Sequence, residues 1–119
     1  IMDIAAALQV TSNRPELAEE MFDMLLSSLP KDTAAIVEPW ENEDYDGLLA
    51  AVHRLHGATR YCGVPCLRHA LDQFETCIKA KRYHELPQHM KHCMQQIDSL
   101  QQWAQSHDWR SLLVPVDTF

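Results

Sequence analysis

Residues 52–65, VHRLHGATRYCGVP, contain the side chains best suited to chemistry in this chain. Two histidines, His53 and His56, stand three positions apart, and Gly57 follows them inside a segment whose apolar spacing predicts a helix. Imidazole changes charge near neutral pH and can act as a nucleophile, a base or a ligand for an anion. A glycine inside a helix costs about 1 kcal/mol relative to alanine, so Gly57 requires a reason.

The helical register separates the two histidines. At about 100° per residue, His56 falls inside the core-facing arc towards one edge, and His53 falls just outside it on the same flank. Gly57 lies one turn beyond His53, where it leaves room for an approaching group, and Arg60 continues that flank. We therefore predict an exposed imidazole that accepts and holds an anion, assisted by His56 and Arg60. The core-facing arc comprises Tyr45, Leu48, Leu49, Val52, Leu55, Thr59 and Cys62.

Less specific explanations exist for each of these residues. A histidine on a helix surface is usually ordinary polar surface, and a boundary histidine such as His56 is often satisfied by a neighbouring carbonyl. A glycine inside a helix often marks a place where another helix packs closely. Gly63 needs no special function, because it fits the left-handed position that follows a helix end.

Composition limits the possible partners. The chain has 119 residues with 46% hydrophobic side chains, which predicts one domain over residues 1–119, with a core at 3–106 and a tail or linker at 107–119. A net charge of −7 argues against nucleic acid and anionic membrane as partners. No apolar run approaches the roughly 20 residues that cross a bilayer, and no basic leader precedes residues 1–10. Because the chain begins with Ile1, we expect a piece of a longer protein.

Cysteine and acidic clusters raise the question of metal. The four cysteines sit in helical patterns without the usual Cys-x2-Cys spacing, so we interpret them as reduced, mostly buried thiols rather than two disulfides or a zinc site. Zinc would require His89, His92 and Cys93, with Cys62 and Cys66 joining them. The acids at 41–46 are interpreted as a solvated connection, since nothing fixes the spacing that Mg²⁺ needs.

The apolar pattern predicts an all-α, antiparallel up-down four-helix bundle with additional N-terminal helices. A short helix is expected over 3–9. A second begins after an Ser12-Asn13 cap, stops at Pro30 and restarts at Asp32-Thr33. Further helices are expected over about 44–62, 64–81 and 84–107. The inward side chains are predicted to be Leu17, Met21, Met24, Leu25 and Leu29; Leu67, Leu71 (or Ala70), Phe74 and Ile78; and Met90, Met94 (or Cys93), Ile97, Leu100 and Ala104.

These residues resemble a known family. The stretch H-R-L-H-G, with a second glycine six positions after the first, is similar to the signature of histidine-containing phosphotransfer (HPt) domains. Leu29-Pro30 and Phe74-Glu75 also look family-like, and the resemblance covers roughly residues 3–106. Within the family it is most similar to the C-terminal module of hybrid sensor histidine kinases of the BarA/GacS type. It implies that His53 is the phospho-acceptor, Gly57 leaves room for a receiver domain, and Glu75 contacts the imidazole. His56 stands where the family usually has lysine, so its charge should depend on pH.

The resemblance implies a phosphoryl carrier of a two-component phosphorelay. His53 would accept a phosphoryl group from a receiver-domain aspartate and pass it to a response regulator. No G-x-x-x-x-G-K-[ST] loop is present, so the domain is expected to have no ATP site and no cofactor of its own, and to use Mg²⁺ supplied by the receiver. We expect a monomer, in the cytoplasmic C-terminal part of an inner-membrane sensor kinase. Alternatives are a non-catalytic helical interaction module, a metal-binding bundle built from His84, His89, His92 and Cys93, and an HPt domain that docks without being phosphorylated.

Overall fold

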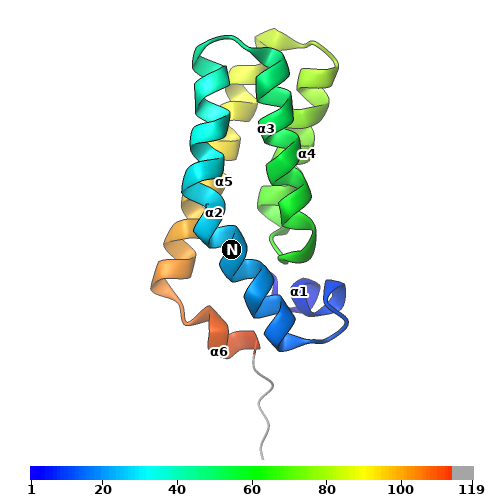
Figure 1. Ribbon diagram of the computed structural model, residues 1–119, viewed down its shortest axis with the longest axis vertical. Coiled ribbons are helices and arrows are strands. Elements are labelled where there is room, and N and C mark those ends of the chain that lie inside the picture. Colours follow the sequence, from blue (N-terminus) through cyan, green and yellow to red (C-terminus); the bar gives the residue numbers. More distant parts are fainter. Residues whose placement is uncertain (114–119) are drawn as a thin grey trace, which may run out of the picture.

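The computed structural model describes residues 1–113, and throughout this range the regular elements are helical, with no strand (Figure 1). Four long helices form the body, and a short helix lies at each end of the chain. In chain order the elements are α1 (Ile4–Val10), α2 (Pro15–Glu41), α3 (Tyr45–Ala58), the 3-10 turn η1 (Thr59–Tyr61), α4 (Pro65–Lys79), the 3-10 turn η2 (Tyr83–Glu85), α5 (Leu86–Ser106) and α6 (Trp109–Leu113).

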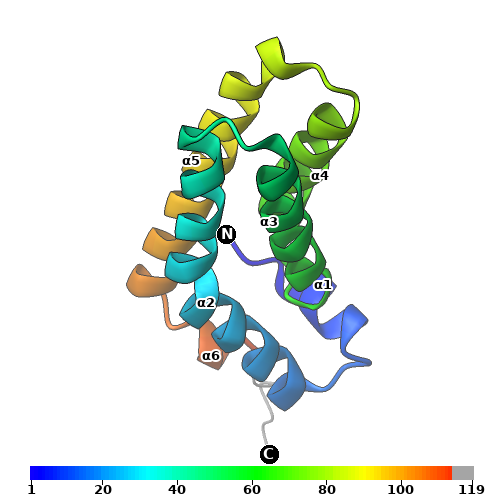
Figure 2. The same cartoon turned by 45° about the horizontal axis from the view of Figure 1, so that its top comes forward.

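The predicted four-helix bundle is confirmed. Helix α3 packs between α2 and α4, and α4 packs against α5 (Figures 1 and 2). Successive long helices are antiparallel, because a connection of a few residues is too short to run back along the bundle and start a parallel helix. The predicted inward side chains of α4 and α5 are buried with little exception; Cys93 rather than Met94 faces the core. The buried set on these two helices includes Leu67, Ala70, Leu71, Phe74, Ile78, Met90, Cys93, Ile97 and Leu100.

Helix α2 differs from the sequence prediction, because it continues through both prolines instead of stopping at Pro30. A proline inside a helix removes one backbone hydrogen bond and usually bends or breaks the helix. Here the flanking turns are held by tertiary packing, since Leu29 and Ile36 on either side of Pro30 are fully buried. Packing therefore overrides the local signal, and the restart at Asp32-Thr33 is not needed.

In the first half of α2, Leu25 and Leu29 are buried as predicted, but one predicted inward residue is exposed and one that was not predicted is buried. Met24 is 60% exposed, whereas Phe22 is fully buried. The reason lies at the other end of the chain: the Phe22 ring packs edge-on against Trp109 at 4.6 Å and against Trp103 at 6.2 Å between ring centroids. The prediction lacked this contact, because residues 107–119 were expected to be a tail.

Residues 109–113 instead form α6, which closes one end of the bundle. Arg110 of α6 makes ion pairs with Glu19 at 3.1 Å and Asp23 at 2.7 Å on α2, and its guanidinium lies 4.4 Å from the centroid of the Trp109 ring. A five-residue helix has no periodicity of its own to detect, and these long-range contacts define it. Residues 114–119 of the expected tail lie outside the described residues.

Glycine and asparagine turns place α1 against the bundle. Ser12 and Asn13, expected to cap α2, adopt left-handed φ values of 56° and 59°, and Arg14 occupies the cap position without a side-chain hydrogen bond. Gly63 has a φ of +64°, as predicted for a residue after a helix end. Its carbonyl accepts a 2.6 Å hydrogen bond from the Asp3 amide, which fastens the start of α1 beside the end of α3.

Candidate functional site

His53 lies on α3 and is the more exposed of the two histidines. Asp44 caps the helix by accepting a 3.0 Å hydrogen bond from the Gly47 amide, and the buried Leu48, Val52 and Leu55 set its rotation. With these residues facing the core, the His53 side chain is 69% exposed and the His56 side chain is only 20% exposed. The predicted register, with His56 at the edge of the core and His53 just outside, is therefore confirmed.

A single carboxylate holds both imidazoles. Glu75 of α4 is 7% exposed; its Oε2 lies 3.0 Å from Nδ1 of His53, and its Oε1 lies 3.0 Å from Nδ1 of His56. Lys79, one turn further along α4, places its Nζ 2.8 Å from the same Oε2. Three donors thus converge on two carboxylate oxygens, which satisfies a buried charge that would otherwise be unfavourable.

This carboxylate stays ionised under ordinary conditions. Burial by itself raises the pKa of Glu75, but hydrogen bonds from Lys79, His56 and His53 outweigh that effect and lower the pKa to about 2. An ionised carboxylate only accepts hydrogen bonds. A neutral imidazole facing it must therefore carry its proton on Nδ1 and keep its lone pair on Nε2. For His53 that lone pair is on the exposed side of the ring, in position to act as a nucleophile.

His56 is oriented by Glu75 in the same way, but its other ring nitrogen lies near a second carboxylate. Its Nε2 lies 4.0 Å from Oδ1 of Asp72, a residue that is 61% exposed on α4. The neighbouring-carbonyl explanation for His56 is wrong, because its partner is the carboxylate of Glu75. His56 therefore belongs to the same hydrogen-bonded group as His53.

Gly57 faces open space. A Cβ built on this residue would meet no atom within 4 Å outside its own helix. Close packing of another helix, the structural alternative for this glycine, is therefore wrong. Within residues 1–113, no contact explains why a glycine stands one turn after His53.

Two basic residues differ from the sequence prediction in their relation to the Glu75 carboxylate. Arg60 is exposed near the end of α3 and does not contact Glu75, so it is not part of the carboxylate group. Lys79 was not predicted, although its spacing of four residues from Glu75 on a helix is the usual spacing of an ion pair.

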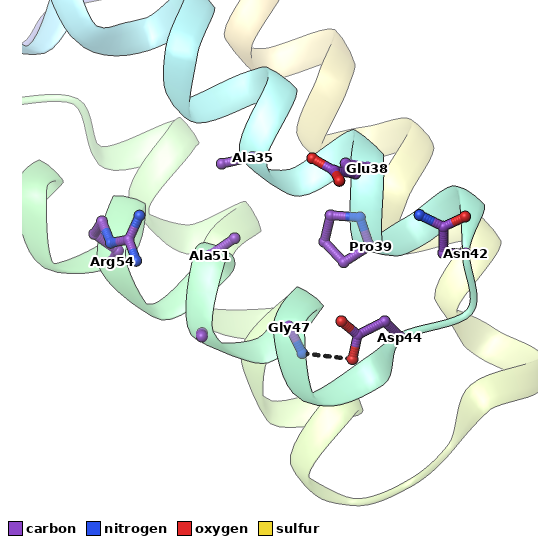
Figure 3. A pocket seen from close by; sticks show the side chains of 9 residues that line it. Ala35, Glu38, Pro39, Asn42, Asp44, Gly47, Ala51 and Arg54 are labelled. Carbon is purple, nitrogen blue, oxygen red and sulfur yellow. Dashed lines mark hydrogen bonds between the residues drawn. The ribbon is translucent and has the colours of Figure 1, made fainter.

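A hollow in the described residues lies on the other flank of α3, between α2 and α3 (Figure 3). Its volume is about 370 Å³, and its walls include Glu38, Asp44 and Arg54 but not His53. Small side chains such as Ala35 and Ala51 create the space. Figure 3 shows the cap between Asp44 and Gly47 on its border, so part of its polar lining already serves helix α3.

Residues 1–113 contain no group of three His, Cys, Asp or Glu side chains placed to hold a metal ion. All four cysteines are free thiols; Cys62, Cys77 and Cys93 are buried, and Cys66 is exposed. Burial raises the pKa of Cys62 to about 11 and that of Cys93 to about 12, which keeps both thiols protonated and unreactive. Within the same residues, no helix combines the length and apolar character of a membrane span.

The fold and the site together define a class: a helical bundle that presents an exposed imidazole at its surface and orients it with a buried carboxylate. Comparison with known proteins identifies the family. The family model described as the Hpt domain matches residues 20–110. The chain belongs to the HPt domain family, the histidine phosphotransfer modules of two-component signalling.

Individual relatives agree with this assignment. The chain is 43% identical to the sensor protein GacS of Pseudomonas syringae pv. syringae over 84 residues, which cover 71% of this chain and 9% of that protein. It is 30% identical to the signal transduction histidine-protein kinase BarA of Escherichia coli K12 over 79 residues, covering 66% of this chain and 9% of BarA. The chain thus spans about a tenth of the length of these kinases.

A solved structure matches as well. The crystal structure of the HPT domain of a sensor hybrid histidine kinase from Shewanella superposes with a TM-score of 0.70 at 25% identity, covering 90% of this chain and 96% of that one. Hpt domains of hybrid kinases interact with receiver domains and response regulators in phosphorelays.

Proposed function

We propose that His53 is the residue that carries the phosphoryl group, with Nε2 as its nucleophile. The supporting observation is the hydrogen bond between Nδ1 of His53 and Glu75 on a ring that is 69% exposed. The Nε2 lone pair attacks the phosphorus of a receiver aspartyl phosphate. A P–N bond forms, the P–O bond to the aspartate breaks, and its electron pair returns to the carboxylate. The reverse step on a second receiver delivers the phosphoryl group.

The carboxylate group explains how the ring can take on this charge. Phosphorylation at Nε2 leaves the proton on Nδ1, so the ring becomes cationic while it is bonded to phosphorus. Glu75 lies 3.0 Å from that proton-bearing nitrogen and stabilises the new positive charge. Lys79, on the same carboxylate oxygen, keeps Glu75 ionised and balances its charge when the ring is neutral.

The other predicted residues have supporting roles in this proposal. His56 holds the second oxygen of Glu75 and adds positive charge beside the phosphoryl group when protonated. Gly57 leaves the space in which the receiver approaches His53, and Arg60 lies at the edge of that surface. The transfer needs Mg²⁺, which the receiver supplies with its own acidic residues.

The wider context is also a proposal. We propose that residues 1–119 form one HPt domain, monomeric when isolated, in the cytoplasmic part of an inner-membrane hybrid sensor kinase related to those named above. Its donor is a receiver domain of that kinase and its acceptor is a response regulator. The non-catalytic interaction module remains the alternative, and it predicts that His53 can be replaced without loss of function.

The test is intact mass at neutral to alkaline pH after mixing the domain with a phosphorylated receiver and Mg²⁺. Wild type, His53→Gln and His56→Gln are compared. We expect one added phosphoryl group that is lost on acidification and is absent only from His53→Gln. If the added phosphoryl group were missing only from His56→Gln, the phospho-accepting residue would be His56 and not His53. If none of the three proteins gained a phosphoryl group from several receivers, the non-catalytic interaction module would be favoured.

A further inference from the structure

Charge is divided unevenly between the helices around His53. Residues 15–46, which form α2 and lead into α3, contain ten Asp or Glu and one lysine. Residues 53–82, which run from His53 through α4, contain two Asp or Glu and six Lys or Arg. The chain as a whole carries a net charge of −7. The segment from His53 to Arg82 is therefore net positive within an otherwise acidic protein, and Arg60 in η1 and Lys81 and Arg82 after α4 supply the excess, since α3 and α4 each contain as many acidic as basic residues.

Two neighbouring hollows, which share two lining residues, extend through this positive region from His56. The first, of about 340 Å³, lies between α3 and α4 and is lined by His56, Pro65, Arg68, His69 and Asp72. The second, of about 80 Å³, shares Pro65 and Arg68 with the first and continues past Arg60 to Val10 of α1. We refer to the side chains Val10, His56, Arg60, Pro65, Arg68, His69 and Asp72 as the arginine groove, in which Asp72 is the one acidic member and lies 4.0 Å from Nε2 of His56.

The arginines of this groove have free charges. Within residues 1–113, neither Arg60 nor Arg68 makes an ion pair, and both are exposed. Lys79 and Arg82, the basic residues at the far end of α4, are paired with Glu75 and Glu85. Unpaired arginines beside a hollow are suited to bind carboxylates, because the guanidinium offers a fork of donors.

The opposite flank of α3 has the reverse character. The hollow between α2 and α3 contains Glu38 and Asp44, and Arg54 is the only basic side chain in its lining (Figure 3). A domain that docks on His53 therefore meets a positive groove on one side and an acidic helix on the other. The groove is continuous with the site, because His56 shares the Glu75 carboxylate with His53.

We propose that the arginine groove binds acidic side chains at one edge of the receiver domain that docks on His53, while Glu38 and Asp44 on the opposite flank of α3 repel that same edge. This inference rests on the proposed phosphotransfer function and adds the chemistry of the partner. The two flanks then allow one docking orientation and reject its reverse, since like charges facing each other are unfavourable. Because donor and acceptor receivers must use the same His53, both must carry the acidic edge on the same side.

The experiment compares Arg68→Glu with Lys91→Glu, a change of equal charge at an exposed position of α5 outside the groove. The rate measured is kcat/KM for phosphoryl transfer from a phosphorylated receiver to the domain. We expect Arg68→Glu to lower kcat/KM by roughly five- to tenfold at about 0.01 M ionic strength, with Lys91→Glu within about twofold of wild type. The difference should close at about 1 M salt, where charges are screened beyond about 3 Å.

Arg68→Gln serves as a milder variant with a smaller expected loss, and circular dichroism checks that each variant is folded. A receiver whose acidic edge is replaced by lysine should transfer its phosphoryl group to Arg68→Glu with a kcat/KM close to that of the original pair. The same receiver should transfer poorly to the wild-type domain. Equal rates for Arg68→Glu and Lys91→Glu, while wild type transfers normally, would overturn the groove and leave the proposed function intact. Absence of transfer to wild type from every receiver would overturn both.

Discussion

Glu75→Gln is the sharpest test of how the site works, because it keeps the shape of the side chain and changes only its hydrogen bonding. Three donors face the carboxylate: Nδ1–H of His53, Nδ1–H of His56 and the ammonium of Lys79. Glutamine offers one accepting oxygen and one donating amide. At least one donor must then lose its partner, or one imidazole must move its proton from Nδ1 to Nε2.

A proton on Nε2 of His53 would occupy the lone pair that attacks phosphorus. The loss of negative charge also removes the partner of the cationic phosphorylated ring. A hydrogen bond to a charged group contributes about 1.5–3 kcal/mol, so we expect the transfer rate to fall by roughly 10- to 100-fold. Single-turnover transfer from a phosphorylated receiver measures the rate, and ¹⁵N NMR of the His53 ring reports which nitrogen carries the proton.

Asp72→Asn is the matched control. It makes the same carboxylate-to-amide change on the same helix, but Asp72 is 61% exposed and lies 4.0 Å from His56 rather than beside His53. At about 1 M salt, where the charges of the arginine groove are screened, we expect its rate to stay within about twofold of wild type, since exposed pairs contribute little. A Glu75→Gln rate as fast as that of Asp72→Asn, with the Nδ1–H form of His53 unchanged, would refute the orienting role of Glu75.

Three further changes have defined outcomes. Because the folded pKa of Glu75 is about 2 and its ordinary value is 4.5, ionisation stabilises the fold above pH 4.5 and this contribution is lost as pH falls from 4.5 towards 2. Urea unfolding at several pH values should therefore show wild type losing up to about 3 kcal/mol more than Glu75→Gln over that range. Gly57→Ala fills open space in a helix, so it should raise the free energy of unfolding by about 0.5–1 kcal/mol while raising KM for receivers; a fall in stability would contradict the open space. Gly63→Ala should lower stability by about 2 kcal/mol in thermal unfolding, because φ is +64° and its Cβ would lie 2.5 Å from the Asp3 carbonyl oxygen. No loss there would mean that α1 is not fastened at Gly63.

Local patterns were sufficient where the structure depends on local spacing. The register of α3 placed His53 outside the core and His56 at its edge, and their side chains are 69% and 20% exposed. Gly63 was recognised from its place after a helix end. Local patterns were insufficient where contacts between distant segments determine burial. Phe22 was not among the predicted inward side chains, because Trp109, 87 positions later, completes its pocket. Pro30 was expected to stop a helix that buried neighbours on both sides keep continuous.

In the candidate site, too, local spacing predicts the relation between residues of one helix but not the contacts between helices. His53 and His56 share one helix, so their relation follows from α-helical geometry alone. Their common partner Glu75 lies on α4, and the resemblance to the HPt family suggested it rather than any spacing in the chain. Glu75 can contact both rings only because of the rotation of α4 against α3. Leu71, Phe74 and Ile78 set this rotation by filling the core. These apolar side chains therefore fix which nitrogen of His53 faces Glu75.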